Sequence, residues 1–97
     1  MKVMAIGTII QAPTPEQRQQ IMPKEVPATL KLYLDGRIEQ FWLRENGIGV
    51  IFLMAAESVA KAKDAVDGLP LTVAGLMKFE LLPVGPLAPL GMLIQGQ

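Results

Sequence analysis

Residues 37–55 read RIEQFWLRENGIGVIFLMA, which is two β-rich runs on either side of Asn46-Gly47. Asn-Gly is the dipeptide preferred in two-residue type I′ turns, because both central residues of such a turn have positive φ. The stretch therefore predicts a β-hairpin with one strand over 37–45 and the other over 48–55.

The chain before the hairpin predicts a strand followed by a helix. Residues 2–10 form a short β-rich run, and a helix-start pattern follows it. In that pattern Thr14 is the expected N-cap, Pro15 occupies the first helical position, and Gln17 completes a capping box.

Two prolines interrupt this helical stretch. Pro23 and Pro27 each remove an amide donor and crowd the preceding turn, so we expect two helical pieces with a break within 22–27. The second piece is expected to end at Gly36. Its predicted apolar face consists of Val26, Leu30, Tyr33 and Leu34.

The chain after the hairpin predicts a second helix and a last strand. Glu57-Ser58 opens a helix that runs through Asp67 and ends at Gly68, with Val59, Ala62 and Val66 facing inward. Leu69-Pro70-Leu71 is interpreted as a connector and 75–82 as a strand. The order β-α-β-β-α-β predicts an α+β domain over 1–83, a ferredoxin-like plait whose four-stranded antiparallel sheet is backed by two helices.

Alternation within the strands predicts a second covered face of the sheet. In the hairpin, Phe41 and Leu43 share one face, and Ile38, Trp42 and Arg44 share the other with Gln40. In the last strand, Met77, Phe79 and Leu81 oppose a face that carries Lys78 and Glu80. A face that mixes large apolar side chains with charged ones is suited to being covered by a second sheet. A second copy of the chain would supply that sheet, so the pattern implies a homodimer.

The carboxyl-terminal segment supports association. Residues 84–97 contain no charged residue, and Pro86 and Pro89 forbid a regular helix. Six large apolar side chains in a tail of a 97-residue chain are typical of a subunit interface. The alternative is that the tail folds across its own subunit.

Composition excludes several classes of chemistry. The chain has nine basic and nine acidic residues, and it contains neither His nor Cys. Balanced charge gives no electrostatic reason to expect a nucleic-acid partner or a membrane surface. Thiol chemistry and His-dependent catalysis are excluded within the chain, and no residue spacing predicts a metal site. No apolar run approaches a membrane span and no secretion signal is recognised, so we expect a cytoplasmic protein.

Taken together, several short motifs resemble the muconolactone isomerase family of dimeric α+β barrels. The motifs are Gly36-Arg37 before the hairpin, Trp42 on its first strand, Glu57-Ser58, Leu69-Pro70-Leu71, and Glu80 with Pro83. The resemblance implies homodimers that pack into larger rings. It also implies cofactor-free proton transfer on an unsaturated lactone in aromatic catabolism.

The resemblance carries a few functional positions over to this chain. Glu25 matches a helix-one glutamate placed to shuttle a proton, and Lys24 lies close to the position of a family lysine. Trp42 matches a pocket-lining tryptophan. The arginine that follows this tryptophan in the family is displaced here to Arg44, and the prolines around Glu25 also depart from the family pattern.

Each candidate residue also has a structural interpretation. Burial in an apolar pocket suits the Glu25 carboxylate to proton abstraction and return; alternatively, Glu25 is a solvated residue in the first turn of the second helical piece. Tyr33, Trp42 and Arg44 are candidates to frame a pocket for a planar anion together with Lys78. Alternatively, Trp42 is a core or interface residue. Glu80 is the second candidate base.

Two functions remain open. One is a cofactor-free isomerase, or a related lyase, that acts on a small lactone or cyclic ketone through Glu25. The other is a non-catalytic oligomeric ligand-binding or accessory protein of a catabolic or biosynthetic cluster, which the scarcity of ionisable groups favours. In both cases the expected partners are a second copy of the chain and a small-molecule ligand.

Overall fold

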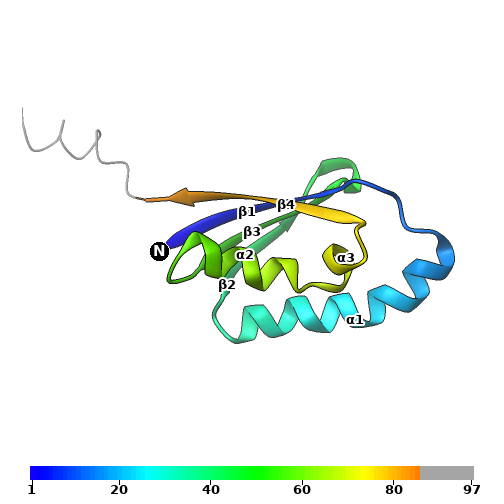
Figure 1. The fold of residues 1–97 in the computed structure, drawn as a ribbon, viewed down its shortest axis with the longest axis horizontal. Helices are drawn as coiled ribbons and strands as arrows, with labels where there is room; N and C mark the ends of the chain where they lie inside the picture. The colour runs from blue at the N-terminus through cyan, green and yellow to red at the C-terminus, as the bar shows by residue number, and fades with distance from the viewer. Residues whose placement is uncertain (86–97) are drawn as a thin grey trace, which may run out of the picture.

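A computed structural model describes residues 1–85 and has one four-stranded antiparallel sheet with strand order β2-β3-β1-β4. All helices lie on one face of this sheet (Figure 1), which confirms the ferredoxin-like plait. The elements are β1 (Lys2–Ile9), α1 (Pro15–Leu34), β2 (Ile38–Leu43), the short 3-10 turn η1 (Glu45–Gly47), β3 (Gly49–Ala55), α2 (Val59–Asp67), α3 (Pro70–Val73) and β4 (Met77–Val84).

The core lies between the sheet and the helices. On β1, Val3 and Ala5 are fully buried on the helical side, whereas Met4 and Ile6 lie on the opposite side, which we call the outer face. Strand β3 contributes Phe52 and Met54 to the same core, and α2 contributes Ala62 and Val66. None of the helices within residues 1–85 is long and apolar enough to cross a membrane.

The predicted hairpin is confirmed, but its connection is longer than a two-residue turn. Asn46 and Gly47 both have positive φ, at 63° and 64°. The Arg44 amide donates to the Gly49 carbonyl at 2.9 Å, so four residues, 45–48, separate the closing pair. Asn46 and Gly47 therefore adopt the positive φ angles that Asn-Gly favours, but they do so within a four-residue loop and not in a two-residue turn.

A β-bulge in β2 places Ile38 on the opposite face of the sheet from the one expected. Ile38 pairs with Met54 and Gln40 pairs with Leu53, so Glu39 is the extra residue. Because one inserted residue reverses the alternation of side chains, Ile38 faces the core and is 1% exposed. Trp42 pairs with Ile51 on the outer face. The expectation that Ile38 and Trp42 share a face is therefore wrong.

Helix α1 is continuous, and the expected break within 22–27 is wrong. Its start is as predicted, because Thr14 and Gln17 form the capping box. Pro23 and Pro27 are four residues apart and both are exposed. The carbonyl groups that lose their amide partners therefore lie on the solvent side, where they are accessible to water, and the core side of the helix stays intact.

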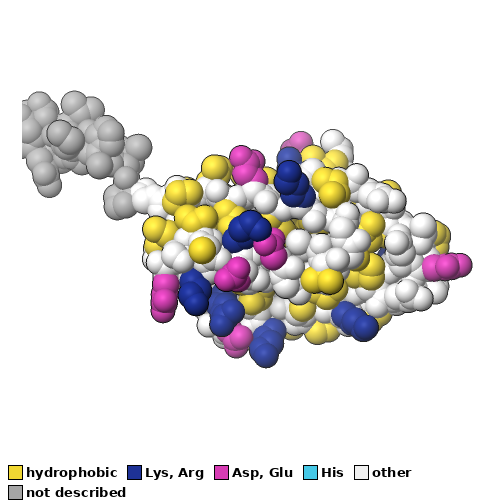
Figure 2. Space-filling model, viewed as in Figure 1, with side chains coloured by type: hydrophobic (Ala, Val, Ile, Leu, Met, Phe, Trp, Pro, Cys, Tyr) yellow, Lys and Arg dark blue, Asp and Glu magenta, His cyan; other side chains and the backbone are white. Residues whose placement is uncertain are grey.

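The buried face of α1 also differs from the expectation. Val26, Leu30, Tyr33 and Leu34 are all more than 40% exposed. Apolar side chains also reach the surface over α1 in the space-filling view (Figure 2). Since the two prolines face solvent, the opposite side of the continuous helix packs inward. The inward residues are Ile21, Met22, Glu25, Ala28 and Leu32.

The second half of the chain largely follows the prediction. Ser58 caps α2, with its hydroxyl accepting from the Lys61 amide at 3.2 Å, and Gly68 ends the helix. The expected connector at 69–71 is wrong, because Pro70 starts the one-turn helix α3. Strand β4 ends at Val84, so the expected tail of 84–97 begins inside the sheet, and its residues 86–97 lie outside the described part of the chain.

Gly49 is the position in the hairpin where a side chain has no room. A Cβ there would lie 1.9 Å from the Gly7 carbonyl oxygen, whereas a Cβ at Gly47 would meet no atom within 4 Å. We expect Gly49→Ala to lower the free energy of unfolding by roughly 3 kcal/mol or more, because backbone overlap is not relieved by side-chain rotation. Gly47→Ala should cost about 1–2 kcal/mol from positive φ alone. Urea denaturation measures both, and equal losses would contradict the close approach of β3 to β1.

Candidate functional site

Glu25 is the buried charged residue of the described chain, and it joins two helices. Its side chain lies on α1 and is 7% exposed. One carboxylate oxygen, Oε1, accepts from the Leu71 amide at 2.8 Å, and the other, Oε2, accepts from the Thr29 hydroxyl at 3.2 Å. Leu71 lies in the first turn of α3, whose N-cap residue makes no side-chain hydrogen bond. Glu25 therefore caps α3 from another helix.

The two prolines orient Glu25. With about 100° between successive residues of a helix, Glu25 lies roughly 200° around α1 from both Pro23 and Pro27. Because the prolines face solvent, Glu25 faces the interior. The structural interpretation of a solvated helix-start residue is therefore wrong, and Glu25 is instead a buried residue in the middle of one helix.

An apolar cavity of about 360 Å³ lies beside this contact, between α1, α3 and the hairpin end of the sheet. We call it the α1–α3 cavity. Leu71 belongs both to its wall and to the Glu25 contact. Arg18 is the one charged residue of its wall. The full lining is Ile9, Pro13, Arg18, Met22, Leu43, Gly47, Gly49, Val50, Leu71, Leu76 and Met77.

Arg18, Met22 and Glu25 lie along one face of α1. Their spacing of four and then three residues brings them onto one side of a continuous helix. Arg18 and Glu25 are about 10 Å apart along the helix axis, at 1.5 Å per residue. A small molecule with an anionic group at Arg18 would thus lie against Met22 and extend toward the Glu25 end.

A second group of expected site residues lies on the outer face of the sheet. The Arg44 guanidinium donates to the Thr8 hydroxyl at 2.6 Å and to the Gly7 carbonyl at 3.5 Å. Thr8 is on β1, so this side chain crosses β3 at Gly49, which has no side chain to block it. Lys78 pairs with Thr8 from the other side, and Glu80, which pairs with Ile6, lies two pairs further along.

The structure separates the expected site residues into two places. Glu25 faces the helical side, while Trp42 and Arg44 are on the outer face, so these groups do not meet within one chain. Tyr33 packs on Phe41 on the helical side, with ring centroids 5.1 Å apart. Lys24 is exposed next to Glu25 in sequence but about 100° around the helix.

Sequence reasoning missed Arg18, Met22 and Leu71. The signal for the first two was the seven-residue spacing from Arg18 to Glu25, which has meaning only when α1 is treated as one helix. No local signal identified Leu71, because its role depends on a backbone amide of a one-turn helix that packs against α1.

Comparison with solved structures shows that other proteins share this fold. No protein-family model and no curated protein sequence matches the chain. A crystal structure of muconolactone isomerase superposes with a TM-score of 0.74 at 19% identity, covering 89% of this chain and 90% of that one. A 5-chloro-2-hydroxyhydroquinone dehydrochlorinase from Burkholderia phenoliruptrix AC1100, in complex with 2,5-dihydroxybenzoquinone, superposes with a TM-score of 0.63 at 18% identity, covering 88% and 94%. The chain therefore has the fold of muconolactone isomerase, as the resemblance in its sequence predicted.

Proposed function

We propose that the chain is a cofactor-free isomerase, or a related lyase, that moves a proton on a small lactone or cyclic ketone. The observation that carries this proposal is the buried Glu25 carboxylate, which accepts a hydrogen bond from Leu71 in the wall of the α1–α3 cavity and shares a face of α1 with the lining residues Arg18 and Met22. The fold is shared with an isomerase of a lactone and with a dehydrochlorinase that holds a small quinone, which supports this substrate class.

In the proposed mechanism Arg18 and Glu25 have separate roles. The Arg18 guanidinium binds a carboxylate of the substrate, and the apolar ring lies against Met22 and Leu71. Glu25 removes a proton from a ring carbon, so that a C–H bond breaks and an O–H bond forms on the carboxylate. The double bond shifts, and the same proton returns to another carbon, so the product is an isomer of the substrate.

The hydrogen bonds of Glu25 are compatible with this role. Each carboxylate oxygen has two lone pairs, and each accepts one hydrogen bond within the chain. The Leu71 amide fixes the orientation of Oε1. Thr29 carries a rotatable hydroxyl, so its bond to Oε2 is released without moving the backbone, and Oε2 is the proposed proton acceptor.

The same two hydrogen bonds favour a second candidate function. If the only role of Glu25 is to tether α1 to α3, its burial is fully explained by the bonds to Leu71 and Thr29. The chain would then be a non-catalytic oligomeric ligand-binding or accessory protein. The isomerase needs the negative charge of the Glu25 carboxylate, because this group must accept a proton. The accessory protein needs only the shape of Glu25 and its hydrogen bonds.

Glu25→Gln distinguishes them. Glutamine keeps an oxygen for the Leu71 amide but does not accept a proton near neutral pH. We expect turnover of a muconolactone-like substrate to fall by roughly 10²–10⁴-fold, with a loss of about 1 kcal/mol in the free energy of unfolding. Absorbance assays and urea denaturation measure the two effects.

The matched control is Glu16→Gln, which neutralises an exposed carboxylate on the same helix and should leave turnover unchanged. Full turnover by Glu25→Gln on a substrate that the native chain converts would show that the base lies elsewhere. Absence of turnover by the native chain would favour the accessory function.

We further propose that a second copy of the chain covers the outer face, giving a homodimer. Trp42 and Leu82 are 46% and 43% exposed on this face, and Met4, Ile6 and Ile51 lie between them. An apolar surface of this kind flanked by Arg44 and Lys78 is typical of a subunit interface.

Charge inserted in the centre of the outer face should break this dimer. Light scattering is expected to give twice the 10.5 kDa of one chain for the native protein. Ile51→Lys should give a folded monomer, because a lysine would be desolvated between the two sheets. Leu30→Lys, on the exposed side of α1, is the control and should remain dimeric. A native monomer at micromolar concentration would refute the proposed interface.

A further inference from the structure

One row of residues crosses all four strands at the hairpin end of the outer face. Arg44 directly follows β2, and its amide donates to the carbonyl of Gly49, the first residue of β3. Gly49 pairs with Thr8 of β1, and Thr8 pairs with Lys78 of β4. Paired residues of an antiparallel sheet point to the same face, so the Arg44, Thr8 and Lys78 side chains all lie on the outer face. No helix of residues 1–85 covers this face (Figure 1).

A guanidinium and an ammonium are both within reach of the Thr8 hydroxyl. Gly49 has no side chain, so the Arg44 guanidinium extends across β3 and donates to Thr8 Oγ1 at 2.6 Å. From the other side, pairing places the Cα of Lys78 about 4.5–5.5 Å from the Cα of Thr8. The flexible four-carbon stem of lysine is long enough to bring its ammonium to a ligand at this hydroxyl. Thr8 and Lys78 also line one cavity of about 380 Å³, which we call the β4 cavity.

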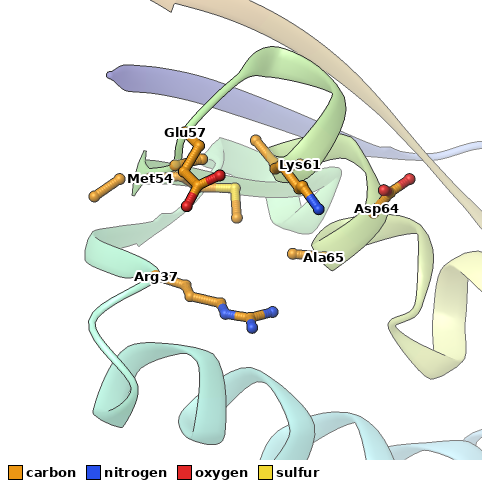
Figure 3. Close-up of a pocket in the computed structure, with 9 residues that line it drawn as sticks. Arg37, Met54, Glu57, Lys61, Asp64 and Ala65 are labelled. Atoms are coloured by element: carbon orange, nitrogen blue, oxygen red, sulfur yellow. The ribbon is translucent and has the colours of Figure 1, made fainter.

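This arrangement differs from that of a larger cavity beside α2. The larger cavity has a volume of about 480 Å³, and its lining includes the cations Arg37 and Lys61. Their side chains lie at opposite ends of it (Figure 3). One small anion therefore does not contact both of them, whereas Arg44 and Lys78 approach the same hydroxyl from two sides.

The donors around Thr8 are available to a ligand. Both hydrogen bonds of the Arg44 guanidinium, to Thr8 and to the Gly7 carbonyl at 3.5 Å, come from Nη1, so its Nε and Nη2 donors remain. The Thr8 hydroxyl accepts from Arg44, and within the described chain its own proton is donated to no other group. Neither Arg44 nor Lys78 forms a salt bridge within residues 1–85. The row thus combines two positive charges with unused donors, which suits an anion.

The neighbouring row of the outer face defines the rest of the ligand. It contains Trp42, Ile51, Ile6 and Glu80, in this order across the sheet. Ile6 and Glu80 line the β4 cavity, so an apolar group of a ligand bound at Thr8 lies on Ile6. The Glu80 carboxylate repels a second negative charge on the ligand, which favours a monoanion over a dianion. The full lining is Ile6, Thr8, Ile10, Lys78, Phe79 and Glu80.

We propose that the β4 cavity binds a small organic monocarboxylate, whose carboxylate accepts hydrogen bonds from Arg44, Thr8 and Lys78. Its apolar body lies on Ile6. Hydrogen bonds between ionised partners are shorter and stronger than neutral ones. The Arg44 side chain is partly buried and already held by Gly7 and Thr8, so it loses little freedom on binding. The polar groups all come from one chain, and the cavity shares no lining residue with the α1–α3 cavity, so the proposal depends on neither the homodimer nor the isomerase function.

The test is a titration of the isotopically labelled full chain with sodium benzoate, followed through amide chemical shifts. We expect saturable shifts at 7–9, at Arg44 and Gly49, and at 77–80. Benzyl alcohol, which keeps the ring but has no charge, should produce no saturable shift at these amides. Phthalate, which carries a second carboxylate, should bind more weakly than benzoate, and Glu80→Gln should narrow this difference.

Arg44→Gln and Lys78→Gln should each weaken benzoate binding by about tenfold or more, because each removes a charge-assisted hydrogen bond. The same spectra show whether each variant is folded. Lys2→Gln is the matched control. Lys2 is also on the outer face of the sheet, but it lies six residues from Thr8 along β1 and pairs with Glu39, so its loss should leave benzoate binding unchanged.

Unchanged binding in the Arg44 and Lys78 variants would overturn the proposal. An equal loss of affinity in the Lys2 variant would indicate a general effect of charge and would overturn it too. Shifts confined to the amides around Arg18 and Met22 would also contradict it while supporting the α1–α3 cavity, so the two proposals fail separately.

Discussion

The hydrogen bond from the Leu71 amide to the Glu25 carboxylate is the contact on which the helical layer depends. A buried carboxylate is costly unless it is hydrogen-bonded, and a one-turn helix without a side-chain cap leaves its first amides free. The Glu25 carboxylate of α1 and the Leu71 amide of α3 each supply the hydrogen-bond partner that the other needs. The same contact holds Leu71 in the wall of the α1–α3 cavity, so the packing requirement and the candidate site share one interaction.

The orientation of α1 that buries Glu25 also explains how the helix accommodates its two prolines. Pro23 and Pro27 lie on the solvent side, where freed carbonyl groups reach water, and their position turns Glu25 toward the core. The apolar residues of the second half of α1, such as Leu30 and Leu34, are exposed as a result. The orientation of α1 that buries Glu25 therefore leaves these apolar side chains at the surface.

Local signals in the sequence predicted much of the fold. Asn46-Gly47 predicted the hairpin, and the caps at Thr14 and Ser58 predicted two helix starts, because each depends on neighbouring residues alone. The bulge at Glu39 and the continuity of α1 depend on tertiary packing, so Ile38 was assigned to the wrong face and the helix was divided. The burial of Glu25 agrees with one of its two interpretations, but the expected break hid the position of Arg18 on the same face of α1.

The most direct test of the proposed site is a crystal structure of the chain soaked with a muconolactone-like acid. The carboxylate of the ligand is expected to bind Arg18, and its ring is expected to lie against Met22, directed toward Glu25. A ligand bound instead on the outer face beside Trp42 and Arg44, with the α1–α3 cavity empty, would contradict this expectation.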